Sequence, residues 1–108
     1  MEENELRINI ILSLQGALVG NISQHVRGIC CDWQSTEWVK LKFYLNIEPN
    51  EEERELMSVV LTEFESNIQT SGFQFKKYYE GMIYSTKPFE KLDKFKIVVY
   101  WRNENPIF

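Results

Sequence analysis

The sequence predicts an α+β fold with two layers, in which two helices cover one face of an antiparallel four-stranded sheet in the order α-β-β-α-β-β. Residues 37–47 alternate apolar and polar side chains, which is the pattern of a half-buried strand. Pro49 and an acidic run follow at once and open a segment whose apolar residues recur every three or four positions, as in an amphipathic helix. The strand and the helix each have one apolar side, so we expect them to pack against each other.

The first element is expected to be an amphipathic helix over residues 3–19. Leu6, Ile10 and Leu14 recur there at helical spacing, and glutamates lie in the first turn, where they stabilise the positive end of the helix dipole. Gly20 comes next and can adopt the left-handed conformation that ends many helices. The helix is therefore predicted to end at about residue 19.

The next two elements are predicted to form a hairpin. Residues 23–33 are rich in β-forming side chains and predict the first strand. Gly28 lies inside this segment, where a glycine often marks a β-bulge or the close approach of another part of the chain. The short polar connection at residues 34–36 then favours pairing with the strand 37–47.

The second helix is expected over residues 50–67. Asn50 with Glu53 three residues later is a capping-box pattern, and Glu48 before Pro49 is an alternative start. The apolar residues that recur along the helix are Leu56, Val59, Val60, Phe64 and Ile68. The central helix-on-sheet contact is predicted to consist of Leu56, Val60, Phe64, Leu41, Phe43 and Val99.

Residues 73–84 and 94–103 predict the third and fourth strands, which we expect to form a second hairpin across an ordered loop. A short tail that contains Pro106 ends the chain. In the third strand, alternation places Phe73, Phe75, Tyr79 and Ile83 on one face and Gln74, Lys76, Tyr78 and Glu80 on the other. In the fourth strand, Phe95, Ile97, Val99 and Trp101 are expected to face inward.

Length and charge limit the possible classes of protein. At 108 residues the chain is expected to form one domain, residues 1–108, with a core that needs no metal or disulfide. The net charge of −4 disfavours attraction to nucleic acid phosphates and favours a basic partner. The acidic residues after Met1 differ from a secretory or transit peptide, and no apolar run approaches the ~20 residues that span a bilayer. We expect a cytoplasmic protein that does not bind membranes.

Residues that usually carry catalysis are sparse. His25 is the only histidine, and no serine or cysteine lies at a catalytic spacing from it. Cys30 and Cys31 are adjacent, so on a strand they point to opposite faces, and we expect two reduced thiols, one in the core and one outward. The glycines form no phosphate-binding motif. The sequence therefore predicts no enzymatic activity, no cofactor and no metal site.

Two surfaces are candidates for binding. The first is the acidic run at the start of the second helix, although acids there also stabilise the helix dipole without any partner. The second is the outer face of the sheet, where aromatic and basic residues alternate as in proteins that bind single-stranded RNA. Cross-strand aromatic pairs also stabilise sheets without a ligand. The outer-face set is Trp38, Lys40, Lys42, Tyr44, Lys76, Tyr78, Tyr100 and Arg102.

Three stretches carry a family resemblance: GALVGNISQHVRGICCDW, VKLKFYLNIEPNEEERELMSVVLTEFES and KFKIVVYWRNE. With them the chain resembles small bacterial immunity proteins of contact-dependent growth inhibition and related polymorphic toxin systems. The resemblance implies a cytosolic protein that binds the toxin domain delivered by a neighbouring cell, often a nuclease, and blocks its active site.

The residues themselves indicate where such a partner would bind. An acidic surface suits a basic RNA-binding cleft, since complementary charge raises association rates, and Trp and Tyr are frequent interface anchors. The predicted partner-binding residues are Trp38, Tyr44, Glu48, Glu51, Glu52, Glu53, Glu55 and Tyr78. The alternative is an RNA-binding or regulatory domain that uses the outer face of the sheet.

Overall fold

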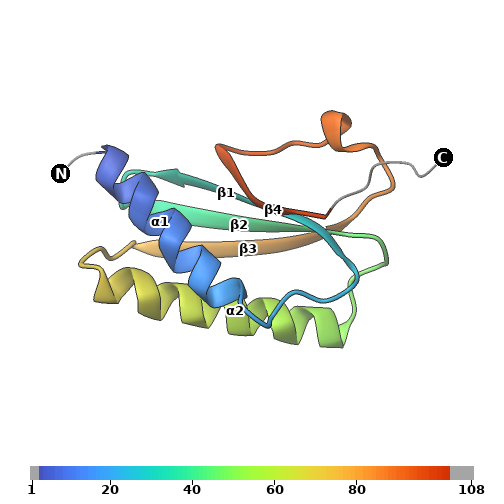
Figure 1. The fold of residues 1–108 in the computed structure, drawn as a ribbon, viewed down its shortest axis with the longest axis horizontal. Coiled ribbons are helices and arrows are strands. Elements are labelled where there is room, and N and C mark those ends of the chain that lie inside the picture. The colour runs from blue at the N-terminus through green and yellow to red at the C-terminus, as the bar shows by residue number, and fades with distance from the viewer. Residues whose placement is uncertain (1–2, 103–108) are drawn as a thin grey trace.

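The computed structural model describes residues 3–102 and has two layers, a four-stranded sheet and a pair of helices that share one core with it (Figure 1). The predicted order α-β-β-α-β-β is confirmed. The elements are α1 (Glu3–Leu18), β1 (Val26–Gln34), β2 (Trp38–Leu45), α2 (Glu51–Thr70), β3 (Lys77–Tyr84), the short 3-10 helix η1 (Phe89–Lys91) and β4 (Ile97–Trp101). The predicted end of the last strand at Asn103 and the tail with Pro106 lie outside the described residues.

The sheet is mixed, so the prediction of a fully antiparallel sheet is wrong. Its strand order is β3-β2-β1-β4; β1 runs antiparallel to β2 and to β4, but β3 runs parallel to β2. The cause is α2, which carries the chain back along the sheet before β3 begins, as in a βαβ unit. The first predicted hairpin, β1 with β2, is confirmed, and the second is absent because β3 and β4 lie at opposite edges.

The segment between β3 and β4 crosses the outer face of the sheet, which is the face away from the helices. Leu92 in this segment is buried against Cys30 and Tyr44, and Phe95 and Trp101 pack around them as a second, smaller core. Figure 1 shows the segment, with η1, running along the far side of the sheet from α2. Part of the outer face is therefore covered.

The main core lies between the sheet and the two helices. Val60, Phe64, Leu41 and Phe43 are all buried there, as predicted. The helical phase of α2 differs at its start, because Met57 is buried whereas Leu56 is only partly buried and Val59 is 43% exposed. The predicted core role of Leu56 and Val59 is therefore wrong. Val99 packs at the margin of the core.

Strand β3 begins at Lys77 rather than Phe73, and this reverses the predicted faces. Phe73 and Phe75 are buried in the irregular connection that precedes the strand. Within the strand, Tyr78 packs against the main core, and Tyr79 is exposed. The alternation could not reveal this, because the connection changes the parity between Phe75 and the strand.

A bulge changes the faces of β4 in the same way. The pairing of β1 with β4 shifts between Ile29 and Cys30, so that Tyr100 packs against the main core. Trp101, which follows the bulge, and Phe95 were both predicted to face the helices and lie instead in the outer cluster. Phe95 precedes β4 and has a positive φ of 55°, so its position has a different cause from the bulge. The extra residue of a bulge adds one step to the alternation, which reverses the side-chain faces beyond it.

Gly28 has both features predicted for it. The pairing of β1 with β2 shifts between Val26 and Gly28, which marks a bulge. The ring of Trp101 lies on Gly28, in the space that a Cβ would take. Gly20 adopts a positive φ of 77°, as predicted for the residue that ends α1.

Candidate partner-binding surfaces

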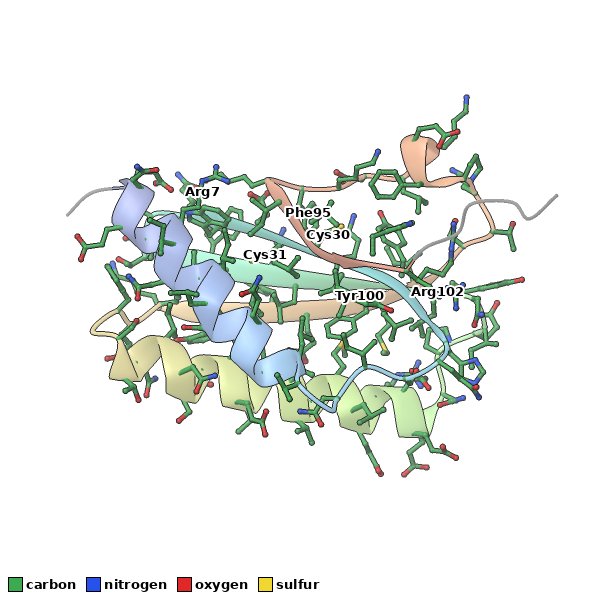
Figure 2. All side chains as sticks on the ribbon, in the orientation of Figure 1. Arg7, Cys30, Cys31, Phe95, Tyr100 and Arg102 are labelled. Carbon is green, nitrogen blue, oxygen red and sulfur yellow. The ribbon has the colours of Figure 1, made fainter. Side chains whose placement is uncertain are left out.

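Charge is divided between two sides of the molecule. The helices α1 and α2 together contain eight glutamates and two arginines, whereas residues 71–102 contain seven lysines and arginines and three acids. Figure 2 shows carboxylate oxygens projecting along the solvent side of α2. Because the helices cover one face of the sheet, the acidic side lies opposite the outer face.

We call the exposed start of α2 the acidic face; it consists of Glu48, Glu51, Glu52, Glu55, Leu56 and Val59. Its four glutamates are exposed, and Glu52, Glu55, Leu56 and Val59 line a shallow hollow of about 310 Å³. The first turn forms because Asn50 caps the helix, with Asn50 Oδ1 accepting from the Glu53 backbone N–H at 2.9 Å. Glu52 and Glu55, two of the eight predicted contact residues, thus lie beside Leu56 and Val59, with Glu51 in the first turn and Glu48 just before the helix.

Glu53 differs from the other predicted acidic residues. Its side chain is only 4% exposed and accepts a hydrogen bond from the Ser23 hydroxyl at 2.7 Å. The prediction of an exposed carboxylate at Glu53 is wrong, because helical spacing turns it toward the loop before β1. Glu53 holds that loop to α2.

Tyr44 was also predicted to be exposed, and it is buried, with 3% of its surface accessible. Its hydroxyl donates to the Asp93 backbone carbonyl at 2.7 Å, and its ring packs edge-on against Trp101. The segment before β4 covers it. The residues that the alternation places outward are therefore not all accessible.

Tyr78 was predicted to lie on the outer face, and this too is wrong. Its ring packs edge-on against Phe64, with centroids 6.2 Å apart, and against Phe75 at 5.8 Å. Burial raises the pKa of its hydroxyl above the usual value. Tyr78 joins α2 to the sheet.

Cys30 and Cys31 point to opposite faces of the sheet, as predicted, but both are buried because Leu92 and its neighbours cover Cys30. Cys30 and Cys31 are neighbours on β1 (Figure 2); Cys31 lies in the main core and Cys30 in the outer cluster. Both are free thiols, as predicted. Burial raises the pKa of Cys30 to about 11, so the thiol is neutral at pH 7.

The exposed part of the outer face is a row of lysines and aromatic rings. Lys40 Nζ lies 5.1 Å from the ring centroid of Trp38 and 5.7 Å from that of Tyr79. Both distances suit cation–π attraction. Within residues 3–102, Lys40 has no carboxylate at ion-pair distance. Trp38, at the start of β2, is partly exposed, which leaves it available to a partner.

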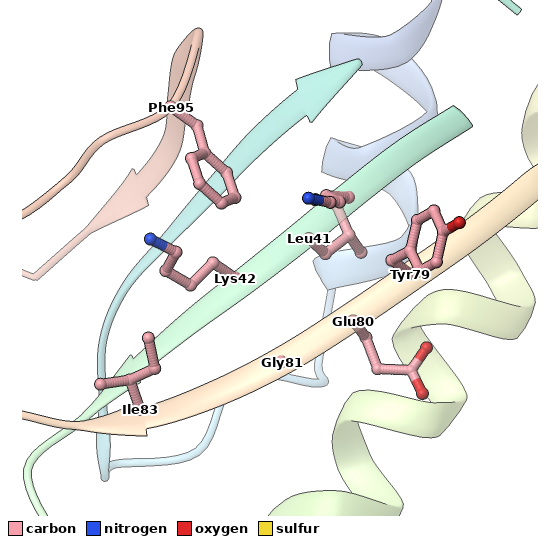
Figure 3. A pocket seen from close by; sticks show the side chains of 8 residues that line it. Leu41, Lys42, Tyr79, Glu80, Gly81, Ile83 and Phe95 are labelled. Carbon is pink, nitrogen blue, oxygen red and sulfur yellow. The ribbon is translucent and has the colours of Figure 1, made fainter. Parts of the chain in front are cut away.

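Lys42 is held more firmly than Lys40. Its ammonium group lies 4.0 Å from the centroid of Phe95 and 3.3 Å from Asp93 Oδ2. The Phe95 backbone N–H donates to Asp93 and lowers the pKa of that carboxyl, which keeps the anion opposite Lys42. A hollow of about 300 Å³ lies beside Lys42, and Gly81 is among the residues that line it. Figure 3 shows these lining residues.

Two apolar surfaces were not predicted. Leu56 and Val59 were assigned to the core because their spacing fits either side of a helix that carries many apolar residues. On α1, Ile8 and Leu12 are exposed although apolar. The sequence could have indicated this exposed apolar surface, because apolar residues are spread almost evenly around α1. A helix that is apolar on all sides is expected to pack against more than one partner.

The described residues offer little for catalysis or metal binding. No cluster of three potential metal ligands occurs among residues 3–102. His25 Nδ1 lies 3.2 Å from Asn46 Oδ1, a contact between side chains at the surface. Within the same range, no helix is long and apolar enough to cross a membrane.

The fold and the two oppositely charged faces describe a small α+β protein whose accessible chemistry lies on its surface. The model of the MafI2 immunity protein family matches residues 7–104, and the chain belongs to that family. A search of curated proteins finds no match. Membership confirms the predicted resemblance to small bacterial immunity proteins of polymorphic toxin systems, and it supports an immunity function whose partner is a cognate toxin protein.

Proposed function

We propose that this protein acts in the cytoplasm by binding a basic nuclease toxin domain, delivered by a neighbouring cell, through the acidic face and blocking its active site. The observation that carries this proposal is the position of Leu56 and Val59 among exposed glutamates. Protein interfaces commonly have an apolar centre and a polar rim. Here the rim has one sign of charge, which specifies a partner of the opposite sign.

The acidic face offers the two contributions that a fast and tight inhibitor requires. Its exposed carboxylates attract a basic cleft over a distance of about a Debye length, which raises the association rate. Leu56 and Val59 lose their contact with water once the complex forms, which lowers the dissociation rate. No catalytic step by this protein is needed.

The proposed blocking of the toxin active site by the acidic face follows from the chemistry of nuclease clefts. A cleft that binds a phosphate backbone is lined with cations, and a row of carboxylates on a rigid helix is complementary to it. Glu51, Glu52 and Glu55 lie within two turns at the capped end of α2, so the cluster is fixed in shape. Substrate and inhibitor would then compete for one surface.

Inhibition of the cognate toxin domain by this protein tests the proposal. We expect co-purification, and loss of nuclease activity once the two proteins are equimolar. L56A/V59A should weaken binding at least ~tenfold, since the side chains whose truncation costs over ~1 kcal/mol cluster at the centre of an interface. V98A is the control, because Val98 is an exposed valine on the opposite side. Failure to bind, or equal loss in both variants, would contradict the assignment.

The alternative function is single-stranded RNA binding on the outer face. It is favoured by the position of Lys40 between the rings of Trp38 and Tyr79, which combines a cation with two stacking surfaces. Titration of labelled single-stranded RNA at physiological salt tests it, with K40A as the variant that should lose affinity. No binding by the unmodified protein would refute it.

A further inference from the structure

We propose that two copies of this chain associate through their β3 strands, aligned antiparallel about Gly81, to give one continuous eight-stranded sheet. Strand β3 is an edge of the sheet, and among residues 3–102 only β2 pairs with it. It is eight residues long, and its outer side therefore has unpaired backbone N–H and C=O groups along that length.

Strand β3 has few of the usual features that protect an edge, and its two charged residues are Lys77 and Glu80. It contains no proline, and its pairing with β2 has no bulge. Its single lysine, Lys77, stands at the first position rather than in the middle. Tyr79 and Ile83 are 42% and 41% exposed, so the edge is also apolar. By contrast, β4 at the other edge is only five residues long.

The strand is complementary to a second copy of itself in this alignment. With Gly81 on the two-fold axis, Tyr79 stands opposite Ile83 of the second copy, and Ile83 opposite its Tyr79. Both residues lie on the outer face and line the hollow of Figure 3 or its rim, so they would form two cross-strand apolar pairs. A two-fold interface requires this reciprocity.

Charge also permits the pairing. Lys77 stands opposite Ser85, and Glu80 stands opposite Met82, so no residue faces a like charge directly. The closest like charges, the two copies of Glu80, are diagonal neighbours at roughly 7–8 Å. A Cβ added at Gly81 would meet nothing within 4 Å, so the outer face of the strand is open at this position.

This dimer needs no toxin. The acidic face lies at the start of α2, so none of its residues belongs to the strand that the dimer uses. The proposal therefore stands or fails independently of the proposed function.

Sedimentation of the full chain over a concentration series from micromolar to several hundred micromolar tests the proposal. We expect the mass to rise toward twice 12.9 kDa. I83K should remain a monomer throughout, because it places a charge in each apolar pair, whereas V98K, on β4, should dimerise like the unmodified chain. A monomer at all concentrations, or equal loss in both variants, would overturn the proposal.

The alignment itself has a separate test. Under mild oxidation, G81C should form a disulfide between copies, because the two introduced sulfurs face each other across the axis. Y79C should form at least ~tenfold less disulfide-linked dimer, because in this alignment residue 79 stands opposite Ile83 of the second copy. More cross-linking through Y79C than through G81C would overturn the assigned register.

Discussion

The contact between Gly28 and Trp101 gives a sharp prediction about stability. In G28A the new methyl group would overlap atoms Cε3 and Cζ3 of Trp101. The indole cannot move without disturbing its neighbours, because it packs against Phe89, with ring centroids 4.2 Å apart, and edge-on against Tyr44. Overpacking of this kind usually costs ~1–3 kcal/mol.

The matched variant is G81A, which is expected to have the opposite effect. A methyl group there meets no atom within 4 Å, and φ at Gly81 is not positive. Replacing glycine by alanine then mainly reduces the entropy of the unfolded chain, which stabilises by ~0.4–1 kcal/mol. Neither glycine has a positive φ, so the contrast tests what an added methyl group would meet.

Urea denaturation of both variants measures these changes. A double-mutant cycle adds the test of cause: in a W101A background, G28A should cost at least ~1 kcal/mol less than in the unmodified protein, because the overlapping ring is gone. Equal costs in the two backgrounds would refute the overlap as the cause. A neutral G28A would refute the close contact itself.

Three other substitutions test the core and the buried polar groups. F64A should lower the free energy of unfolding by ~3–5 kcal/mol, since Phe64 is fully buried between α2 and the sheet, and an unchanged melting temperature would remove that packing from the account. E53A should cost ~1–3 kcal/mol because it removes the buried acceptor of the Ser23 O–H, while the Ser23 oxygen keeps the bond that it accepts from the His25 backbone N–H. E52A, at an exposed site, should cost less than ~0.5 kcal/mol. Burial raises the pKa of the Cys30 thiol from 9.0 to about 11, so this thiol ionises more easily in the unfolded chain. The free energy of unfolding should therefore fall as the pH rises from 9.0 toward about 11, and C30A should reduce that fall. Identical pH profiles for C30A and the unmodified protein would contradict the burial of this thiol.

Sequence patterns predicted the elements well because each has its own periodicity. The hairpin of β1 and β2, the Asn50 cap and the glycine after α1 all depend on local chemistry, and all are confirmed. The core contact of Phe64 with the sheet followed from spacing alone. Such features need no knowledge of distant contacts.

The direction and face of β3 could not be predicted in this way. Whether β3 pairs with β2 or with β4 depends on where α2 delivers the chain, which is a property of packing. The positions of Tyr78 and Tyr100 depend on one irregular connection and one bulge, each of which reverses an alternation. Tyr44 is correctly placed outward, and its burial by Leu92 arises from a loop whose path has no periodic signal.

The candidate binding surface was predicted in part. Glu48, Glu51, Glu52 and Glu55 are exposed as expected, since acids at a helix start follow simple rules. The apolar pair among them was missed, because Leu56 and Val59 fit the core side of α2 equally well by spacing. The helical phase is decided by Met57, which takes the buried position.

The central claim is that the acidic face binds the toxin, and an association-rate measurement tests it most directly. E52K/E55K reverses two charges on that face, and E37K/E90K makes the same change in net charge on exposed residues outside it. With a catalytically inactive toxin domain at low salt, we predict an association rate at least ~tenfold lower for E52K/E55K, with the difference shrinking as salt is added. E37K/E90K should stay within about twofold of the unmodified protein. Equal rates for the two variants would contradict the claim.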